Sequence, residues 1–202
     1  CKIVLDYNEK EDFLKECVDY NGLRDRAKSK GFRLGTSAKE YLKMYSGYQL
    51  QSIEEDIRED IYIGTTCLPS LISEYISSGP FDIMPIMDEL YRNGVMAGFF
   101  CFSIEGGELT NSSLEYEFEI MNIRNQLMEY ILKELDKLGK TKDIAFLEGA
   151  TGKICGYLDF LIFGSFMDIM NAACEFFEEK NIKLAGYKTF RKISKLVTFK
   201  EE

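Results

Sequence analysis

From residue 80 to its end, the sequence predicts one unit three times over, a helix followed by two strands. The predicted helices cover residues 82–93, 123–138 and 166–180, and the predicted strands cover 96–104, 114–120, 144–148, 154–163, 182–190 and 193–199. Short connections within each pair of strands favour hairpins and therefore a mainly antiparallel sheet. Such a sheet, with its helices on one face and its other face partly solvated, predicts an α+β fold.

Three of these strands share the pattern small–Gly–aromatic–x–x–Phe, at residues 97–102, 155–160 and 185–190. A glycine inside a strand lets a ring or another backbone approach closely, so we expect such contacts at all three glycines. The distances between the three segments do not match the helix repeat. The pattern is therefore interpreted as a recurring local solution and not as a duplication.

The first 79 residues are expected to be mainly helical. The sequence predicts a short strand at 2–5 and helices at 13–21, 37–47, 52–64 and 68–79, two of which begin with a capping-box pattern. We therefore expect a helical N-terminal layer in front of the sheet. Since no linker rich in Pro, Gly or Ser separates the two parts, residues 1–202 are predicted to form a single domain, with 1–79 and 80–202 as alternative subdomains.

The chain has no histidine, which excludes Ser–His–Asp triads, Cys–His dyads and imidazole metal ligands. Its six cysteines lie at least sixteen positions apart, so no zinc-binding spacing occurs, and we expect neither metal nor cofactor. Cys67, just before a predicted helix, is a candidate nucleophile. Residues 149–153 predict a glycine-rich hairpin turn in preference to a phosphate-binding loop, because a strand follows them. No catalytic motif is found, which favours a non-enzymatic protein.

Charge is distributed unevenly. The net charge is −9, yet residues 182–200 hold six basic side chains and no acidic one. We expect this predicted hairpin to pair its cations with acidic residues across the sheet, the alternative being a basic patch for a phosphate or an acidic partner. The residues of that patch are Lys188, Arg191, Lys192 and Lys195.

Two groups of acidic residues are candidates for binding a partner protein. The first lies in the predicted helix 52–64, and the second forms an outward row on the predicted strand 114–120, whose apolar residues face the core. The members are Glu54, Glu55, Asp56, Glu59 and Asp60 in the first group, and Glu115, Glu117 and Glu119 in the second. The first hypothesis is therefore a non-enzymatic acidic protein that binds a basic partner protein, such as an immunity-type inhibitor of a bacterial toxin. The same charge argues against nucleic acid as a partner.

A second hypothesis is a small-molecule-binding protein or a carboxylate-based enzyme. Asp159 lies within an apolar strand, where a carboxylate must be paired or have its pKa raised by burial. Glu148, across the predicted hairpin, is the nearest second carboxylate, and two such groups could act as general acid and base.

Cys1 offers a third hypothesis. A first residue that is not Met fits a trimmed chain, or a lipoprotein anchored to a membrane through an acylated Cys1. No apolar run reaches the ~20 residues of a membrane span. Cysteines among apolar positions favour the cytoplasm, and an exported lipoprotein is the alternative.

Overall fold

The computed structural model describes residue 29 and residues 46–50, 57–103 and 113–199. The chain divides into two compact units, residues 1–44 and 45–202, and every element with described bounds belongs to the second unit. The predictions for residues 1–45 therefore lie almost wholly outside the described residues, as do those for 51–56.

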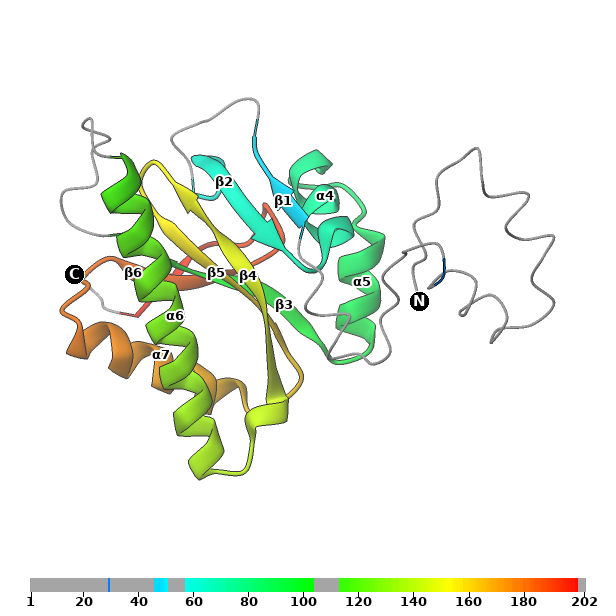
Figure 1. Cartoon of the computed structure of the whole chain (residues 1–202). Helices are drawn as coiled ribbons and strands as arrows, with labels where there is room; N and C mark the ends of the chain where they lie inside the picture. Colours follow the sequence, from blue (N-terminus) through cyan, green and yellow to red (C-terminus); the bar gives the residue numbers. More distant parts are fainter. Residues whose placement is uncertain (1–28, 30–45, 51–56, 104–112, 200–202) are drawn as a thin grey trace. The chain divides into compact units, whose positions relative to one another are not determined.

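The described elements confirm the predicted α+β fold with an antiparallel sheet (Figure 1). In spatial order the strands are β1 (Ser46–Tyr48), β2 (Ile61–Thr66), β4 (Ile144–Gly152), β5 (Gly156–Ile162), β3 (Met96–Phe102), β6 (Ala185–Thr189) and β7 (Val197–Thr198), and every neighbouring pair is antiparallel. The helices are α4 (Pro69–Ser77), α5 (Pro85–Arg92), α6 (Ser113–Lys137) and α7 (Phe166–Glu179), with a 3₁₀ turn at Thr141–Asp143.

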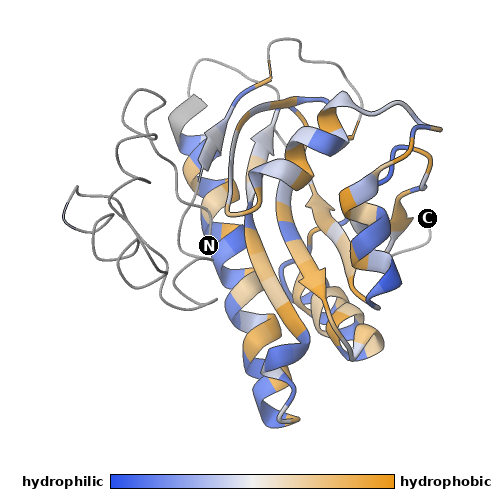
Figure 2. Ribbon diagram, turned by 90° about the vertical axis from the view of Figure 1, so that its right-hand side faces the viewer, coloured by the Kyte–Doolittle hydropathy of each residue, from blue (hydrophilic) through white to orange (hydrophobic). Residues whose placement is uncertain are grey.

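Helices pack on both faces of the sheet, so the expectation of a single helix-covered face is wrong. On one face, α6 and α7 contact each other and enclose the main apolar core with alternate residues of the central strands, among them Phe100, Phe160 and Ile162. On the other face, Tyr75 of α4 packs edge-on against Phe99 of β3. Figure 2 shows the apolar residues concentrated along the strands and the inner sides of the helices. The central strands are therefore buried on both sides.

The three glycine-containing segments lie on adjacent strands, in the order β5, β3, β6. A Cβ atom added at Gly98 would lie 2.5 Å from the carbonyl oxygen of Lys188 and 3.1 Å from the ring of Phe160. At Gly156 it would lie 2.7 Å from the ring of Phe102. The expected close contacts are confirmed, since a neighbouring backbone or ring occupies the space that a side chain would fill.

Residues 114–120, predicted as a strand, are the first turns of α6. The alternation of apolar and acidic residues does not separate inside from outside, since Phe118 is 61% exposed whereas Ile120 is buried. Glutamate has good helix propensity, and the segment continues without a break into the apolar stripe at 123–135. The first predicted unit thus has one described strand, whereas the second and third units each have two.

Residues 57–64 were expected to complete the predicted helix 52–64, but 57–60 form a turn and β2, which pairs with β4, begins at Ile61. The predicted helix 37–47 is likewise wrong at its end, where β1 begins. The spacing of the apolar residues could not distinguish a helix from a strand here, because Ile61 is buried by its place in the sheet and not by a helical stripe.

The segment 149–153 is mostly strand and not turn. β4 continues to Gly152, whose N–H donates to the Cys155 carbonyl at 2.8 Å, so the tight turn lies at 153–155. Gly152 leaves room for the Asp60 carboxylate, since a Cβ atom at Gly152 would lie 2.2 Å from one of its oxygens. This geometry excludes a phosphate loop, which needs a following helix.

Candidate functional site

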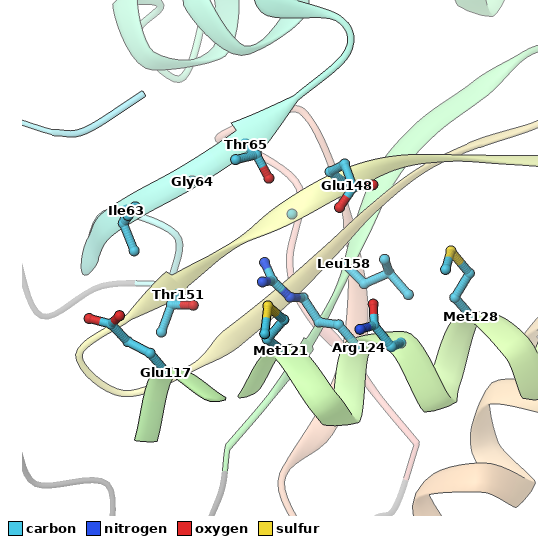
Figure 3. A pocket seen from close by; sticks show the side chains of 12 residues that line it. Ile63, Gly64, Thr65, Glu117, Met121, Arg124, Met128, Glu148, Thr151 and Leu158 are labelled. Atoms are coloured by element: carbon cyan, nitrogen blue, oxygen red, sulfur yellow. The ribbon is translucent and has the colours of Figure 1, made fainter. Parts of the chain in front are cut away.

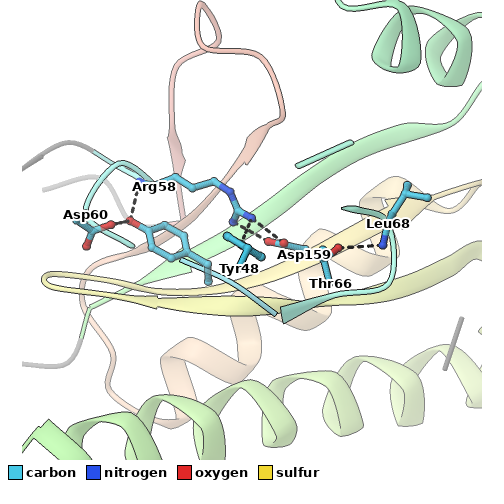
Figure 4. A network of polar contacts seen from close by, with 7 residues as sticks. Tyr48, Arg58, Asp60, Thr66, Leu68 and Asp159 are labelled. Carbon is cyan, nitrogen blue, oxygen red and sulfur yellow. Dashed lines mark hydrogen bonds and ion pairs between the residues drawn. The ribbon is translucent and has the colours of Figure 1, made fainter. Parts of the chain in front are cut away.

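Arg58 and Asp159 form a buried ion pair (Figure 4), and the guanidinium carbon of Arg58 lies 6.0 Å from the ring centre of Tyr75 in α4. Nη1 and Nη2 of Arg58 donate to Oδ1 and Oδ2 of Asp159, each at 2.7 Å, and the residues are 2% and 0% exposed. The guanidinium carbon also lies 4.7 Å from the ring centres of both Phe99 and Phe190. A guanidinium fork on both oxygens of one carboxylate is the strongest pairing available to this residue type.

Burial alone would lower the pKa of Arg58, but the charge and hydrogen bond of Asp159, together with Tyr48 and Tyr75, outweigh that effect and raise the pKa. Burial raises the pKa of Asp159, and the contacts from Arg58 oppose that rise. Asp159 is therefore enclosed and engaged by a permanent cation. Its role in the described structure is to tie β5 to the turn that precedes β2.

Asp60 belongs to the same network and not to an acidic surface. It is 1% exposed, and its Oδ1 accepts a hydrogen bond of 2.5 Å from the Tyr157 hydroxyl. Its Oδ2 accepts from the N–H groups of Ile154 and Cys155, at 2.8 and 3.1 Å. The Tyr157 hydroxyl in turn accepts from the Arg58 N–H at 2.7 Å. Asp60 thus holds the β4–β5 turn.

The remaining acidic candidates are dispersed. Glu59 pairs with Lys192 at 3.1 Å, and Glu115 and Glu119 are exposed on α6. Glu117 lies half-buried on the same helix. The residues outside the described part of the chain are Cys1, Glu54, Glu55 and Asp56.

The basic candidates are partly neutralised by acidic neighbours. Arg191 forms an ion pair with Asp88 of α5, and Lys192 pairs with Glu59. The acidic partners thus come from a helix and a turn, and not from a strand across the sheet. Lys188 lies on β6, and Lys195 is exposed beyond that strand.

A pocket of about 290 Å³ lies between α6 and the strands β2, β4 and β5 (Figure 3). Both polar and apolar side chains line it. The lining residues are Ile63, Gly64, Thr65, Glu117, Met121, Arg124, Asn125, Met128, Glu148, Gly149, Thr151 and Leu158. Ligand pockets commonly start at about 300 Å³, so this one fits a small molecule.

Arg124 extends from α6 into this pocket, with its guanidinium directed toward the strands (Figure 3). It makes no hydrogen bond or ion pair with any residue in the described ranges. Burial lowers its pKa, and the negative charges of Asp159 and Glu148 oppose that effect. A cation that is partly removed from water and has no hydrogen-bond or ion-pair partner among the described residues is a ready receptor for an anion.

Glu148 faces the pocket because β4 has a bulge. The register with β5 shifts between Phe146 and Glu148, so Leu147 is the extra residue, and Glu148 has a left-handed backbone with φ of 80°. By register Glu148 lies opposite Asp159, yet Asp159 bonds Arg58 whereas Glu148 lines the pocket. Bulges re-aim side chains in this way. The two carboxylates proposed as one catalytic pair therefore do not share a cavity.

The bulge also depends on the residue that follows Glu148. A Cβ at Gly149 would lie 2.0 Å from the carbonyl oxygen of Tyr157, so any side chain there would collide with β5. Gly149 thereby allows β4 to approach β5 directly after the strained position. A non-glycine residue at positive φ, held beside a pocket, is a recognised mark of a functional position.

Sequence reasoning identified Glu148 but missed Arg124. The signal was present in the spacing, because Glu117, Met121, Arg124, Asn125 and Met128 recur at helical intervals on one side of α6. Assigning 114–120 to a strand separated Glu117 from the others. With the correct helix boundary, a cation among apolar positions would have been evident.

Other chemistry finds little support in the described ranges. Burial raises the pKa of the Cys67 thiol, which is the opposite of what a nucleophilic cysteine requires. Within those ranges, no group of three or more Cys, Asp or Glu side chains is arranged to hold a metal ion. None of the helices there is long and apolar enough to cross a membrane.

Comparison with known proteins leaves these contacts as the basis for any functional conclusion. No protein-family model, curated protein or solved structure matches the chain.

Proposed function

We propose that this protein binds a small molecule in the pocket between α6 and the strands β2, β4 and β5, through an anionic group that pairs with Arg124. The observation that carries the proposal is the Arg124 guanidinium, which lines an open cavity without a hydrogen bond or ion pair to the described residues. Every other feature of the site is secondary to that one.

An anion is the energetically favoured partner of the Arg124 guanidinium. A guanidinium partly removed from water loses hydration, and burial accordingly lowers the pKa of Arg124. A carboxylate or phosphate would restore two charge-assisted hydrogen bonds at once. Arg58, by contrast, donates from its buried guanidinium to both carboxylate oxygens of Asp159, whereas the Arg124 guanidinium forms no hydrogen bond or ion pair within the described ranges.

This proposal modifies the carboxylate-enzyme hypothesis. Asp159 is committed to Arg58, so Glu148 is the one member of that pair that can reach a ligand in the pocket. We propose binding without assigning a reaction, because Asp159, the second carboxylate of that hypothesis, does not line the pocket.

Calorimetric titration tests the proposal. The probes are acetate, propionate, succinate, inorganic phosphate and the protein amino acids, titrated into the wild type, Arg124→Met and Lys133→Met. Lys133 is an exposed cation on the same helix and outside the pocket, so its variant matches the charge change. We expect at least one probe to bind, with a loss of tenfold or more in Arg124→Met alone. Failure of all probes, or equal affinity in Arg124→Met, would contradict the proposal.

A second candidate is the acidic protein-binding surface, including an immunity-type inhibitor. The observation in its favour is α7, which carries Glu175, Glu178 and Glu179 and no basic side chain, while its other acidic residue, Asp168, pairs with Lys140. Charge complementarity of this kind speeds association more than it raises affinity.

The test is the association rate of a purified partner. We expect the association rate to fall when salt is added. We also expect it to fall in a Glu175→Lys/Glu178→Lys variant, whereas the control Glu89→Lys, on α5, should leave the rate unchanged. An association rate that does not depend on salt would contradict this candidate.

A further inference from the structure

We infer that the pocket selects a small zwitterion, an amino-acid-like molecule whose carboxylate binds Arg124 and whose ammonium binds Glu148. The inference rests on the proposed function and adds the ligand's chemical class.

Glu148 is the acidic side chain that β4 contributes to the pocket. Its carboxylate lines the pocket and makes no hydrogen bond or ion pair with the described residues. An ionised carboxylate only accepts hydrogen bonds, so its partner in a ligand is a donor, best a cationic one. The bulge and the positive φ hold this carboxylate in the pocket at a cost in backbone strain.

Arg124 and Glu148 line the same pocket from opposite walls, α6 and β4, and the described structure records no ion pair between them (Figure 3). A ligand with both charges can therefore lie between them and satisfy each. Its carboxylate would receive the Arg124 fork, and its ammonium would donate to Glu148.

A ligand with a single charge would be repelled by one of the two charges in the pocket. A simple anion at Arg124 would lie near the carboxylates of Glu148 and Glu117, which repel it. A simple cation at Glu148 would meet the charge of Arg124. Binding sites select ligands by repulsion as well as by attraction. A zwitterion avoids both repulsions, because each of its charges lies next to a protein charge of opposite sign.

The rest of the lining fits a small polar molecule with a short apolar part. Thr65, Thr151 and Asn125 offer hydroxyl and amide groups that hydrogen-bond to no other described residue, while Met121 and Met128 supply adaptable apolar walls. The volume of about 290 Å³ favours a ligand of amino-acid size over a nucleotide.

The experiment compares each protein amino acid with two derivatives of itself, the N-acetyl form, which removes the ammonium, and the primary amide, which removes the carboxylate. Propionate and inorganic phosphate serve as simple anions, and propylamine serves as a simple cation. Affinities are measured by calorimetry on the wild type, Glu148→Gln and Glu119→Gln. Glu119 is an exposed acid on α6 outside the pocket, so its variant controls for the loss of one charge.

We expect at least one amino acid to bind tenfold or more tightly than both of its derivatives. In Glu148→Gln, but not in Glu119→Gln, the preference over the N-acetyl form is expected to fall to about twofold or less. Circular dichroism confirms that both variants are folded.

The failures are distinguishable. If propionate or phosphate binds as tightly as any amino acid, and binding depends on Arg124 but not on Glu148, the ligand class is wrong and the proposed function stands. If no probe binds, the proposed function and this inference are both wrong.

Discussion

The guanidinium of Arg58 and the carboxylate of Asp159 are joined by two hydrogen bonds of 2.7 Å, although 101 positions separate the residues in the sequence. This contact fixes the turn before β2 against β5, in the middle of the sheet. Because β2 forms one wall of the pocket, the buried pair also determines where Thr65 and Gly64 lie relative to Glu148. Arg58 thus has a structural role, and the proposed binding role belongs to a different arginine, Arg124.

Replacing Asp159 with Asn should destabilise the fold strongly. The substitution leaves the Arg58 cation buried without its counter-charge, a loss that costs about 3–5 kcal/mol in comparable buried pairs. The free energy of unfolding, measured by urea denaturation, tests this. Asp168→Asn, in a half-exposed pair with Lys140, is the control and should cost below about 1 kcal/mol. Wild-type stability in Asp159→Asn would mean that the pair does not hold the sheet.

Tyr157→Phe should cost about 1–3 kcal/mol, because it removes the hydroxyl shared by Asp60 and the Arg58 N–H and leaves both buried groups short of a partner. Thermal or urea unfolding measures the loss. Tyr91→Phe, on the exposed side of α5, is the matched control and should be nearly neutral. Equal stabilities for the two variants would show that the Tyr157 hydroxyl contributes nothing.

Gly98→Ala should destabilise the protein by about 1–3 kcal/mol, because the new methyl group would meet the Lys188 carbonyl at 2.5 Å. Backbone cannot move aside there without disturbing the β3–β6 pairing. Gly47→Ala is the control, since the nearest atom to its Cβ would be 3.9 Å away, at an ordinary contact distance. Urea denaturation of both variants measures the difference. The close-packing interpretation of the shared glycine pattern fails if Gly98→Ala is no less stable than Gly47→Ala.

At position 148, Gly should be more stable than Ala by about 1 kcal/mol, because a side chain at φ of 80° carries a left-handed strain that glycine lacks. Both substitutions remove the carboxylate, so their difference in unfolding free energy reports the backbone alone. At the exposed helical position Glu119 the order should reverse, with Ala more stable. The same order at both positions would argue against strain at Glu148.

Stability should fall as the pH rises from 10 to 12. Burial, opposed by Arg58 and assisted by Asp159, raises the pKa of Tyr48 from 10.0 to about 12. Between these values the unfolded chain has released the proton and the folded protein retains it, so alkaline pH favours unfolding. Urea denaturation at several pH values should show a shallower decline for Tyr48→Phe and an unchanged one for Tyr91→Phe. An identical slope in Tyr48→Phe would contradict the assignment.

Local periodicity predicted the helices 82–93 and 166–180 and the strands of the second and third units, because each segment shows a clear apolar pattern of its own. It failed at 114–120, where alternating residues satisfied a strand template although the segment begins a long helix. It failed again at 57–64, where pairing with β4 overrides the helical spacing.

The candidate site was only half predictable. Asp159 was correctly marked as a carboxylate that needs a partner, but Arg58 could not be identified, since a contact across 101 positions leaves no local trace. Glu148 was named as a carboxylate partner of Asp159, whereas the bulge that turns it toward the pocket is visible only in the pairing register. Arg124 required the correct start of α6.

The side-chain Nε–Hε resonance of Arg124 offers the most direct measurement of the proposed binding mode. Nuclear magnetic resonance spectra recorded during titration with the amino-acid probes should show this signal moving to saturation, with a dissociation constant equal to the calorimetric value. The signal of Arg191, which is paired with Asp88 on the other side of the sheet, should stay in place. If an amino acid binds while the Arg124 signal does not move, Arg124 does not anchor the ligand.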